Sequence, residues 1–287
     1  MAKFVEIKND ELTAKISLTG AELMSVKNKD GKEFMWEADK NVWANCSPIL
    51  FPICGGLKED RYELFGKEYH MNKHGFIKYA EFFVEDIAES SVTLKTCQTE
   101  ETLKQYPFDF EFRVIFELEG KMLKTTYSVD NKTDKTMYFS VGSHEAYACS
   151  GGIENYTIEF EKPETLKTYI LDGNLLENNF ITITKDSDKL DLLYEYFAVD
   201  ALVFKTFNSK KVSLVRRDGS TKINVEFPEA DYLLFWTKPN GNYICIEPWS
   251  GIQDIVDSSF DFTEKEGILT LEPNKNFKTS HNIIFEK

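Results

Sequence analysis

Residues 111–118 read EFRVIFEL and residues 123–129 read LKTTYSV, and these two stretches decide the class of fold. In each, apolar and polar side chains alternate, as in a β-strand with one face in a core and the other in water. Glu119-Gly120 lies between them, so we expect an antiparallel hairpin. Similar runs recur along the chain and predict strands at 3–8, 12–18, 21–27, 79–86, 91–97, 137–141, 156–160, 202–207, 211–216, 222–227, 232–236, 243–247, 267–271 and 279–285.

Helical patterns are nearly absent from the sequence. Only residues 98–105 and 188–197 indicate short helices, and no blade-length repeat, linker or shift in composition divides the chain. We therefore predict an all-β (mainly β) fold, a large antiparallel β-sandwich that forms a single domain over residues 1–287.

The charge balance excludes two classes of partner. Asp and Glu number 48 against 34 Lys and Arg, for a net charge of −14 at pH 7. Nucleic acids and anionic membranes attract clustered basic side chains, and the sequence has no such cluster. We expect no nucleic acid and no membrane as partner, and a neutral small molecule fits this charge.

The five cysteines indicate a compartment rather than a disulfide framework. They are odd in number and scattered, without a CxxC pair, and most stand among apolar or small neighbours, as buried free thiols do. The N-terminus has no signal-peptide pattern, and no apolar run approaches the roughly 20 residues of a membrane span. The sequence therefore predicts a protein of the reducing cytoplasm.

The first candidate site residue comes after the apolar run SPILFPICGGL at residues 47–57. Residues 62–70 read as a hairpin that turns near Gly66 and delivers His74. Gly75 lets the backbone pass close to whatever the imidazole meets. A lone histidine in a loop is more often incidental than functional, so His74 matters only together with two later segments.

The second segment, VGSHEAY at residues 141–147, comes after a predicted strand and breaks its alternation with small residues. Gly142 and Ser143 permit a tight bend that lifts His144 out of the strand ladder, which is one way to present a catalytic imidazole. The alternative is a strand-end histidine bonded to a neighbouring loop.

The third segment, ICIEPWSGIQD at residues 244–254, is the most specific. Glu247 closes an otherwise apolar strand, where an ionisable group is costly unless it is paired or useful. Pro248 is expected to end that strand, and Trp249 offers a flat apolar face beside the carboxylate. This combination is frequent in sugar sites, and a loop-capping Glu247 is the alternative.

Together, the segments carry a resemblance to a known family. SPILFPI (47–53), HGF (74–76), GSH (142–144) and CIEPW (245–249) resemble, in this order and spacing, the aldose 1-epimerase (mutarotase) superfamily and its LacX-like branch. The resemblance implies a galactose mutarotase-like supersandwich that binds a free pyranose on its concave face. It also implies an isomerase without metal or organic cofactor, whose partner is a small-molecule aldose, and a monomer or homodimer.

The resemblance also implies a role for each candidate residue. Glu247 matches the general base that takes the proton from the anomeric hydroxyl, and His144 matches the general acid that protonates the ring oxygen. His74 matches a second histidine that hydrogen-bonds the sugar near that oxygen. The further substrate-binding residues that it implies are Lys78, Tyr147 and Trp249.

Several residues depart from the family's pattern. Gly56 stands where relatives carry an arginine that helps bind the sugar, and Lys78 stands where they tend to have another arginine. Glu145 replaces a proline, and Tyr147 replaces a phenylalanine. These changes lie at the predicted site, and they leave the affinity for the sugar, the identity of the substrate and the activity itself open.

Three alternatives to an epimerase of neutral hexoses stay open. A hexose-6-phosphate 1-epimerase would need two arginines for the phosphate, where this chain has Gly56 and Lys78. A non-catalytic sugar-binding protein would not need Glu247. A glycosidase would need a second carboxylate, for which Glu145 and Asp254 are the candidates.

Overall fold

The expected hairpin is present and belongs to the larger of two sheets. The computed structural model describes residues 4–286. Strand β8 (Phe110–Glu119) pairs antiparallel with β9 (Met122–Asn131). On β8 the side chains of Phe112, Val114 and Phe116 are buried, and the residues between them are more exposed. The alternation in the sequence therefore does separate a core face from a solvent face.

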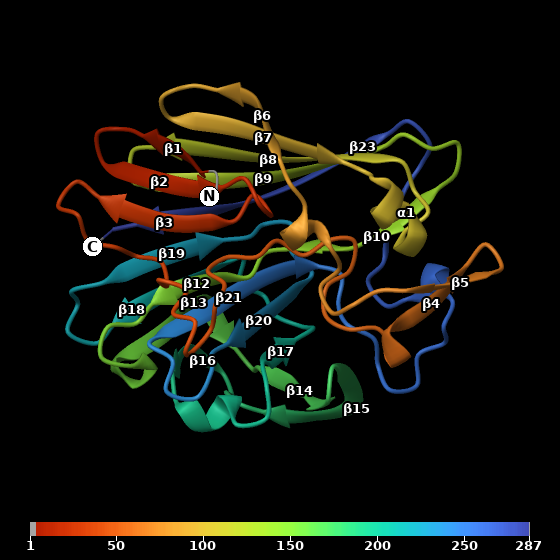
Figure 1. Cartoon of the computed structure of the whole chain (residues 1–287). Coiled ribbons are helices and arrows are strands. Elements are labelled where there is room, and N and C mark those ends of the chain that lie inside the picture. The colour runs from red at the N-terminus through yellow and green to blue at the C-terminus, as the bar shows by residue number, and fades with distance from the viewer. Residues whose placement is uncertain (1–3, 287) are drawn as a thin grey trace.

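Two large sheets stack as layers, with one cluster of buried apolar side chains between them (Figure 1). The nine-stranded sheet has the order β16-β13-β18-β19-β23-β9-β8-β7-β6. The seven-stranded sheet has the order β11-β21-β20-β17-β14-β15, and β12 also pairs with β21. This confirms the predicted all-β antiparallel sandwich.

The other strands of the larger sheet are β6 (Phe83–Ile87), β7 (Ser91–Cys97), β13 (Tyr156–Glu164), β16 (Ser187–Asp191), β18 (Lys211–Arg216), β19 (Lys222–Glu226) and β23 (Asn276–Phe285). The strands of the smaller sheet are β11 (Val141–Gly142), β12 (Glu145–Ala148), β14 (Lys167–Asp172), β15 (Leu175–Thr182), β17 (Leu202–Phe204), β20 (Tyr232–Trp236) and β21 (Tyr243–Ser250). Three small sheets complete the fold: β1 (Phe4–Lys8), β2 (Leu12–Ser17) and β3 (Leu23–Asn28); β4 (Arg61–Leu64) and β5 (Lys67–His70); β10 (Met137–Phe139) and β22 (Leu269–Leu271).

Helices are few and short, as predicted. Helix α1 (Glu100–Gln105) lies within the predicted range 98–105, and Thr99 caps its N-terminus. Within residues 4–286, no helix is long and apolar enough to cross a membrane. Single 3₁₀ turns occupy Lys58–Asp60, Ile77–Tyr79, Ile153–Asn155, Tyr194–Phe197 and Phe262–Glu264.

Two local predictions were wrong, and some strands were not predicted. The helix expected at 188–197 is strand β16 and then a 3₁₀ turn, because Leu190 and Leu192 alternate into the core while β16 pairs with β13. Strands β14 and β15 went unpredicted because β15 is largely exposed at a sheet edge and lacks an apolar rhythm. Pro248 does not end β21, which continues to Ser250.

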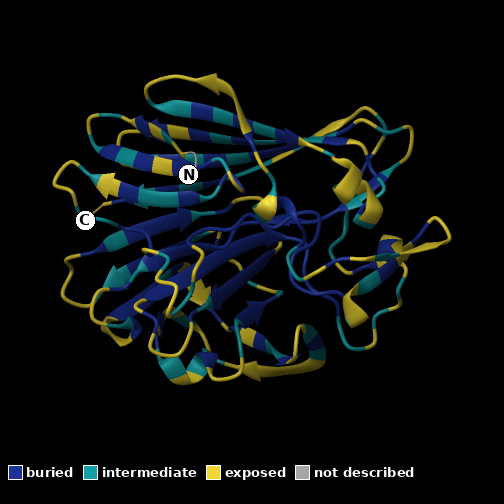
Figure 2. Cartoon of the chain, in the orientation of Figure 1, coloured by how far each residue is buried: buried dark blue, intermediate teal, exposed yellow. Residues whose placement is uncertain are grey.

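Strand β21 is buried along its whole length, since none of its eight residues is open to solvent. Figure 2 shows this region in continuous dark blue, whereas most outer strands alternate with lighter colours. One face of β21 packs on the core between the sheets, and the other faces a pocket that Glu247 and Trp249 line. Ionisable side chains on this second face therefore stand on a strand that is shielded from solvent.

Candidate active site

His144 and Glu247 are direct neighbours across two paired strands. Strands β11 and β12 both pair with β21, and Gly142 lies opposite Trp249 while Glu145 lies opposite Ile246. The pairing register is the same before and after Ser143 and His144, the two residues between β11 and β12, so His144 lies opposite Glu247. Such cross-strand pairs bring side chains into contact, and His144 Nε2 lies 3.5 Å from Glu247 Oε2. The predicted bend is thus a break in the ladder without a shift of register.

Strand alternation decides which neighbours share their face. Successive side chains point to opposite faces, so Cys245, Glu247 and Trp249 lie on one face of β21 and Ile246 on the other. On β12, Glu145 lies opposite Ile246 and therefore points into the core between the sheets.

His74 reaches the same place from the loop after β5. It has a φ of +70°, and Gly75 is next in the chain with a φ of +66°. A Cβ on Gly75 would lie 2.2 Å from the carbonyl oxygen of Phe51, so only glycine fits this close approach. The ring centroid of His74 lies 5.6 Å from that of His144.

The hydrogen bond of His74 assigns its tautomer. Its Nδ1 accepts from the backbone N–H of Gly55 at 3.1 Å. In the neutral ring, the proton must then be on Nε2, which makes that atom a hydrogen-bond donor.

These side chains line one pocket. Trp43 stacks on the His144 ring at 5.1 Å, and Trp236 meets it edge-on at 5.6 Å. The lining residues are Gly55, Lys73, His74, His144, Leu171, Asp200, Ala201, Leu234, Trp236, Glu247, Trp249 and Gln253.

Burial shifts the pKa values of all three ionisable candidates toward their neutral forms. It raises the pKa of Glu247 well above 4.5 and lowers the pKa of His144 to about 3. It also lowers the pKa of His74 well below its ordinary value, and the neighbouring His144 adds to this. Since His144 and Glu247 are in contact, the favoured state of the pair has one proton between them and no net charge.

Four of the six predicted site residues meet at this pocket: Glu247, His144, His74 and Trp249. Lys78 and Tyr147 do not line it. The Lys78 ammonium donates to the backbone carbonyl of Lys73 at 3.3 Å. Tyr147, on β12, lies opposite Ile244 of β21. It is fully buried in the core, on the face of the sheet that points away from the pocket.

Neither predicted second carboxylate faces Glu247 across the pocket. A carboxylate oxygen of Glu145 lies 2.8 Å from Nε2 of His281, and both side chains are buried between the sheets. Asp254 forms a buried ion pair with Lys265 at 2.7 Å.

Two further residues, Lys73 and Asp200, line the pocket but were not predicted from the sequence. Nζ of Lys73 lies 3.6 Å from Oδ2 of Asp200. The position of Lys73 directly before His74 is the one signal that was available. Asp200 comes from a loop between two strands, far along the chain, and no pattern in the sequence marks it.

The position of the missing arginine is occupied by another part of the fold. A Cβ on Gly56 would lie 2.7 Å from the Cβ of Asn174, in the turn between β14 and β15. An arginine at residue 56 would therefore require this turn to move.

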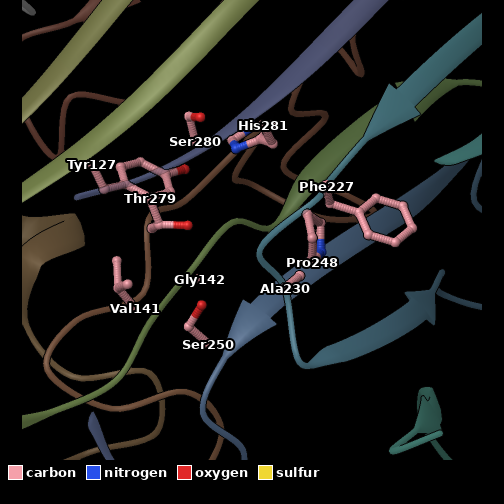
Figure 3. Close-up of a pocket in the computed structure, with 10 residues that line it drawn as sticks. All are labelled: Tyr127, Val141, Gly142, Phe227, Ala230, Pro248, Ser250, Thr279, Ser280 and His281. Atoms are coloured by element: carbon pink, nitrogen blue, oxygen red, sulfur yellow. The ribbon is translucent and has the colours of Figure 1, made fainter. Parts of the chain in front are cut away.

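A second cavity lies between the two large sheets (Figure 3). It is lined by Tyr127 and His281 from the larger sheet and by Gly142, Pro248 and Ser250 from the smaller one. His144 and Glu247 do not line it, so it is separate from the candidate site.

Comparisons with known proteins agree with this arrangement. The sequence profile of the aldose 1-epimerase family matches residues 3–282. Protein LacX, plasmid, from Lactococcus lactis subsp. lactis is 32% identical, with coverage of 97% of this chain and 98% of that protein.

Two solved structures have nearly the same fold. A galactose mutarotase related enzyme from Lactobacillus acidophilus superposes with a TM-score of 0.95 at 35% identity, covering 99% of this chain and 98% of the other. A galactose mutarotase-like protein from Lactobacillus casei gives 0.94 at 28% identity, covering 99% and 100%. The sequence motifs, the profile and the fold therefore agree that the chain belongs to the aldose 1-epimerase family.

Proposed function

We propose that this protein interconverts the α and β anomers of a free, neutral hexose by general acid and base catalysis. The observation that carries the proposal is the His144–Glu247 pair, with ring nitrogen and carboxylate oxygen 3.5 Å apart in the lining of a pocket. Family membership and the free cysteines, four of them buried, support an isomerase of the reducing cytoplasm.

The reaction moves two protons and one bond. Glu247 takes the proton from the C1 hydroxyl while His144 gives a proton to the ring oxygen, and the C1–O5 bond breaks to leave an aldehyde. Rotation about C1–C2 presents the other carbonyl face. On ring closure, Glu247 returns its proton to the carbonyl oxygen, and the C5 hydroxyl returns its proton to His144.

The shared proton of the pair suits this cycle. Ring opening begins with a carboxylate and an imidazolium, and it ends with a carboxylic acid and a neutral imidazole. The pair therefore keeps one proton throughout, and no proton has to come from solvent. The raised pKa of Glu247 and the lowered pKa of His144 favour the second state, which offsets the cost of forming the open chain.

The remaining pocket residues would hold the sugar. His74 has its Nε2–H free to donate near the ring oxygen, and Trp249 presents an apolar face. Lys73 and Asp200 offer a donor and an acceptor to hydroxyl groups.

The direct test of the function is polarimetry of freshly dissolved α-glucose and α-galactose with and without enzyme. The rate must exceed the spontaneous mutarotation of the same buffer. No acceleration for any aldose of a small panel would contradict the proposal and favour a sugar-binding protein.

We expect neutral hexoses to have a higher kcat/KM than their 6-phosphates. The cation that lines the pocket, Lys73, is already paired with Asp200. Residue 56 is glycine instead of arginine, and within the described part of the chain no other arginine lines the pocket. A dianionic phosphate also meets an acidic protein with a net charge of −14. The measurement is kcat/KM for glucose, galactose and glucose 6-phosphate under one condition, and a clear preference for the phosphate ester would favour the hexose-6-phosphate epimerase instead.

We expect the alkaline limb of the pH–rate profile to reflect the raised pKa of Glu247. The active pair carries one proton and burial raises the pKa of Glu247, so the pair loses that proton, and with it the acid, as pH rises through the raised pKa. The measurement is kcat/KM against pH, with the spontaneous rate subtracted at each pH. A rate that only increases as pH rises would show that the pair does not work with one shared proton.

A further inference from the structure

Cys245 lies beside the acid–base pair and has no part in the proposed reaction. It is two residues before Glu247 on β21, so its side chain is on the same face. Its cross-strand partner is Ala146, and it is fully buried in a cluster with Trp36 and Tyr243. Its sulfur, a ring nitrogen of His144 and a carboxylate oxygen of Glu247 all lie within 4.8 Å of one another, and all three residues are buried.

This set of donors has the chemistry of a zinc site. Zn²⁺ binds thiolate, imidazole and carboxylate at about 2.0–2.3 Å in a tetrahedron, which places ligand atoms roughly 3.3–3.8 Å apart. The His144 and Glu247 atoms are already 3.5 Å apart, so only the sulfur has to approach. Three protein ligands leave a fourth position for water, as in catalytic zinc sites, and two of the three, His144 and Glu247, line the pocket.

The arrangement is specific to this place in the molecule. Within residues 4–286, it is the one group of at least three His, Cys, Asp or Glu side chains whose ligand atoms are this close. Cys149 is equally buried but points to the carbonyl of Tyr147, and Cys97 is exposed on β7. These two cysteines provide matched controls.

We propose that the sugar pocket is also a binding site for a soft divalent cation of the Zn²⁺ type, held by Cys245, His144 and Glu247. On binding, the thiol releases its proton to solvent and a Zn–S bond forms. The cation then occupies the acid and the base together, so it excludes the sugar and inhibits the enzyme. The inhibition rests on the proposed function, whereas the binding does not.

The binding test uses Zn²⁺ and calorimetry on the full chain without sugar. We expect one Zn²⁺ per chain for the wild type and for Cys149→Ser. We expect at least about tenfold weaker binding for Cys245→Ser and Cys245→Ala, because even substitutions outside the ligand set of zinc sites cost about 10–100-fold. Co²⁺ in place of Zn²⁺ should give a thiolate-to-cobalt charge-transfer band in the wild type that both Cys245 variants lack.

The activity test uses the same proteins and polarimetry. Zn²⁺ should raise the apparent KM of the wild type, Mg²⁺ should not, and a chelator should restore the rate. Cys245→Ser should keep its basal rate and lose its sensitivity to Zn²⁺, whereas Cys97→Ser should stay sensitive. Equal Zn²⁺ affinity in wild type and Cys245→Ser, or no binding to the wild type, would overturn the proposal. Zn²⁺ binding without any mutarotase activity would instead overturn the proposed function alone.

Discussion

Glu247→Gln should lower kcat for anomer interconversion by about 10²–10⁴-fold, the usual contribution of a positioned general acid or base. Glutamine keeps the size and the hydrogen-bonding reach of the side chain but cannot accept the proton of the C1 hydroxyl. Since the side chain is almost fully buried and its pKa is raised by burial, an amide suits the folded state at least as well as a carboxylate. The thermal midpoint should therefore not fall.

The measurement is kcat by polarimetry together with Tm for the same preparation. Glu101→Gln on α1, where the side chain is exposed, is the matched control and should behave as wild type. A Glu247→Gln rate within a few-fold of wild type would remove Glu247 from the role of base.

His144→Asn and His74→Asn should have different kinetic effects. His144→Asn removes the acid, so kcat should fall by about 10²–10⁴-fold with a small change in KM. His74→Asn removes a hydrogen-bond donor whose other nitrogen is already bonded to the Gly55 backbone. Its KM should therefore rise more than its kcat falls.

Steady-state kinetics of both variants on one sugar separates the two roles. His70→Asn serves as the control, since this histidine lies exposed on β5 beside Glu68. The reverse pattern, with His74→Asn losing turnover and His144→Asn losing affinity, would exchange the roles of the two histidines.

The fold was largely predictable because its strands are amphipathic. β8 and β9 alternate in sequence as they do in burial, so their period alone identifies them. The same rule failed for β15, whose exposed residues carry no apolar pattern, and for β16, whose two inward leucines lie in a segment rich in helix-forming residues. In both cases pairing with a neighbouring strand decides the structure: β15 pairs with β14, directly before it in the chain, and β16 pairs with the more distant β13.

The candidate site was predictable where residues lie in recognisable motifs. Glu247, His144 and His74 each stand in one, and the structure brings them together. The motifs do not show which face of its strand each side chain occupies. Tyr147 is three residues from His144, an odd number, so the sheet turns it to the opposite face. Asp200 depends on how a distant loop folds over the pocket, which no local pattern records.

The buried contact between Glu145 and His281 has a consequence for folding. A strand can slip by one residue along its neighbour, and every side chain then changes face. If β12 slipped in this way on β21, His144 would enter the core and Glu145 would enter the sugar pocket. His281 would then be buried without its partner, at a cost of about 1–3 kcal/mol. The contact therefore selects against a misfolded molecule that would keep its backbone hydrogen bonds and lack its acid.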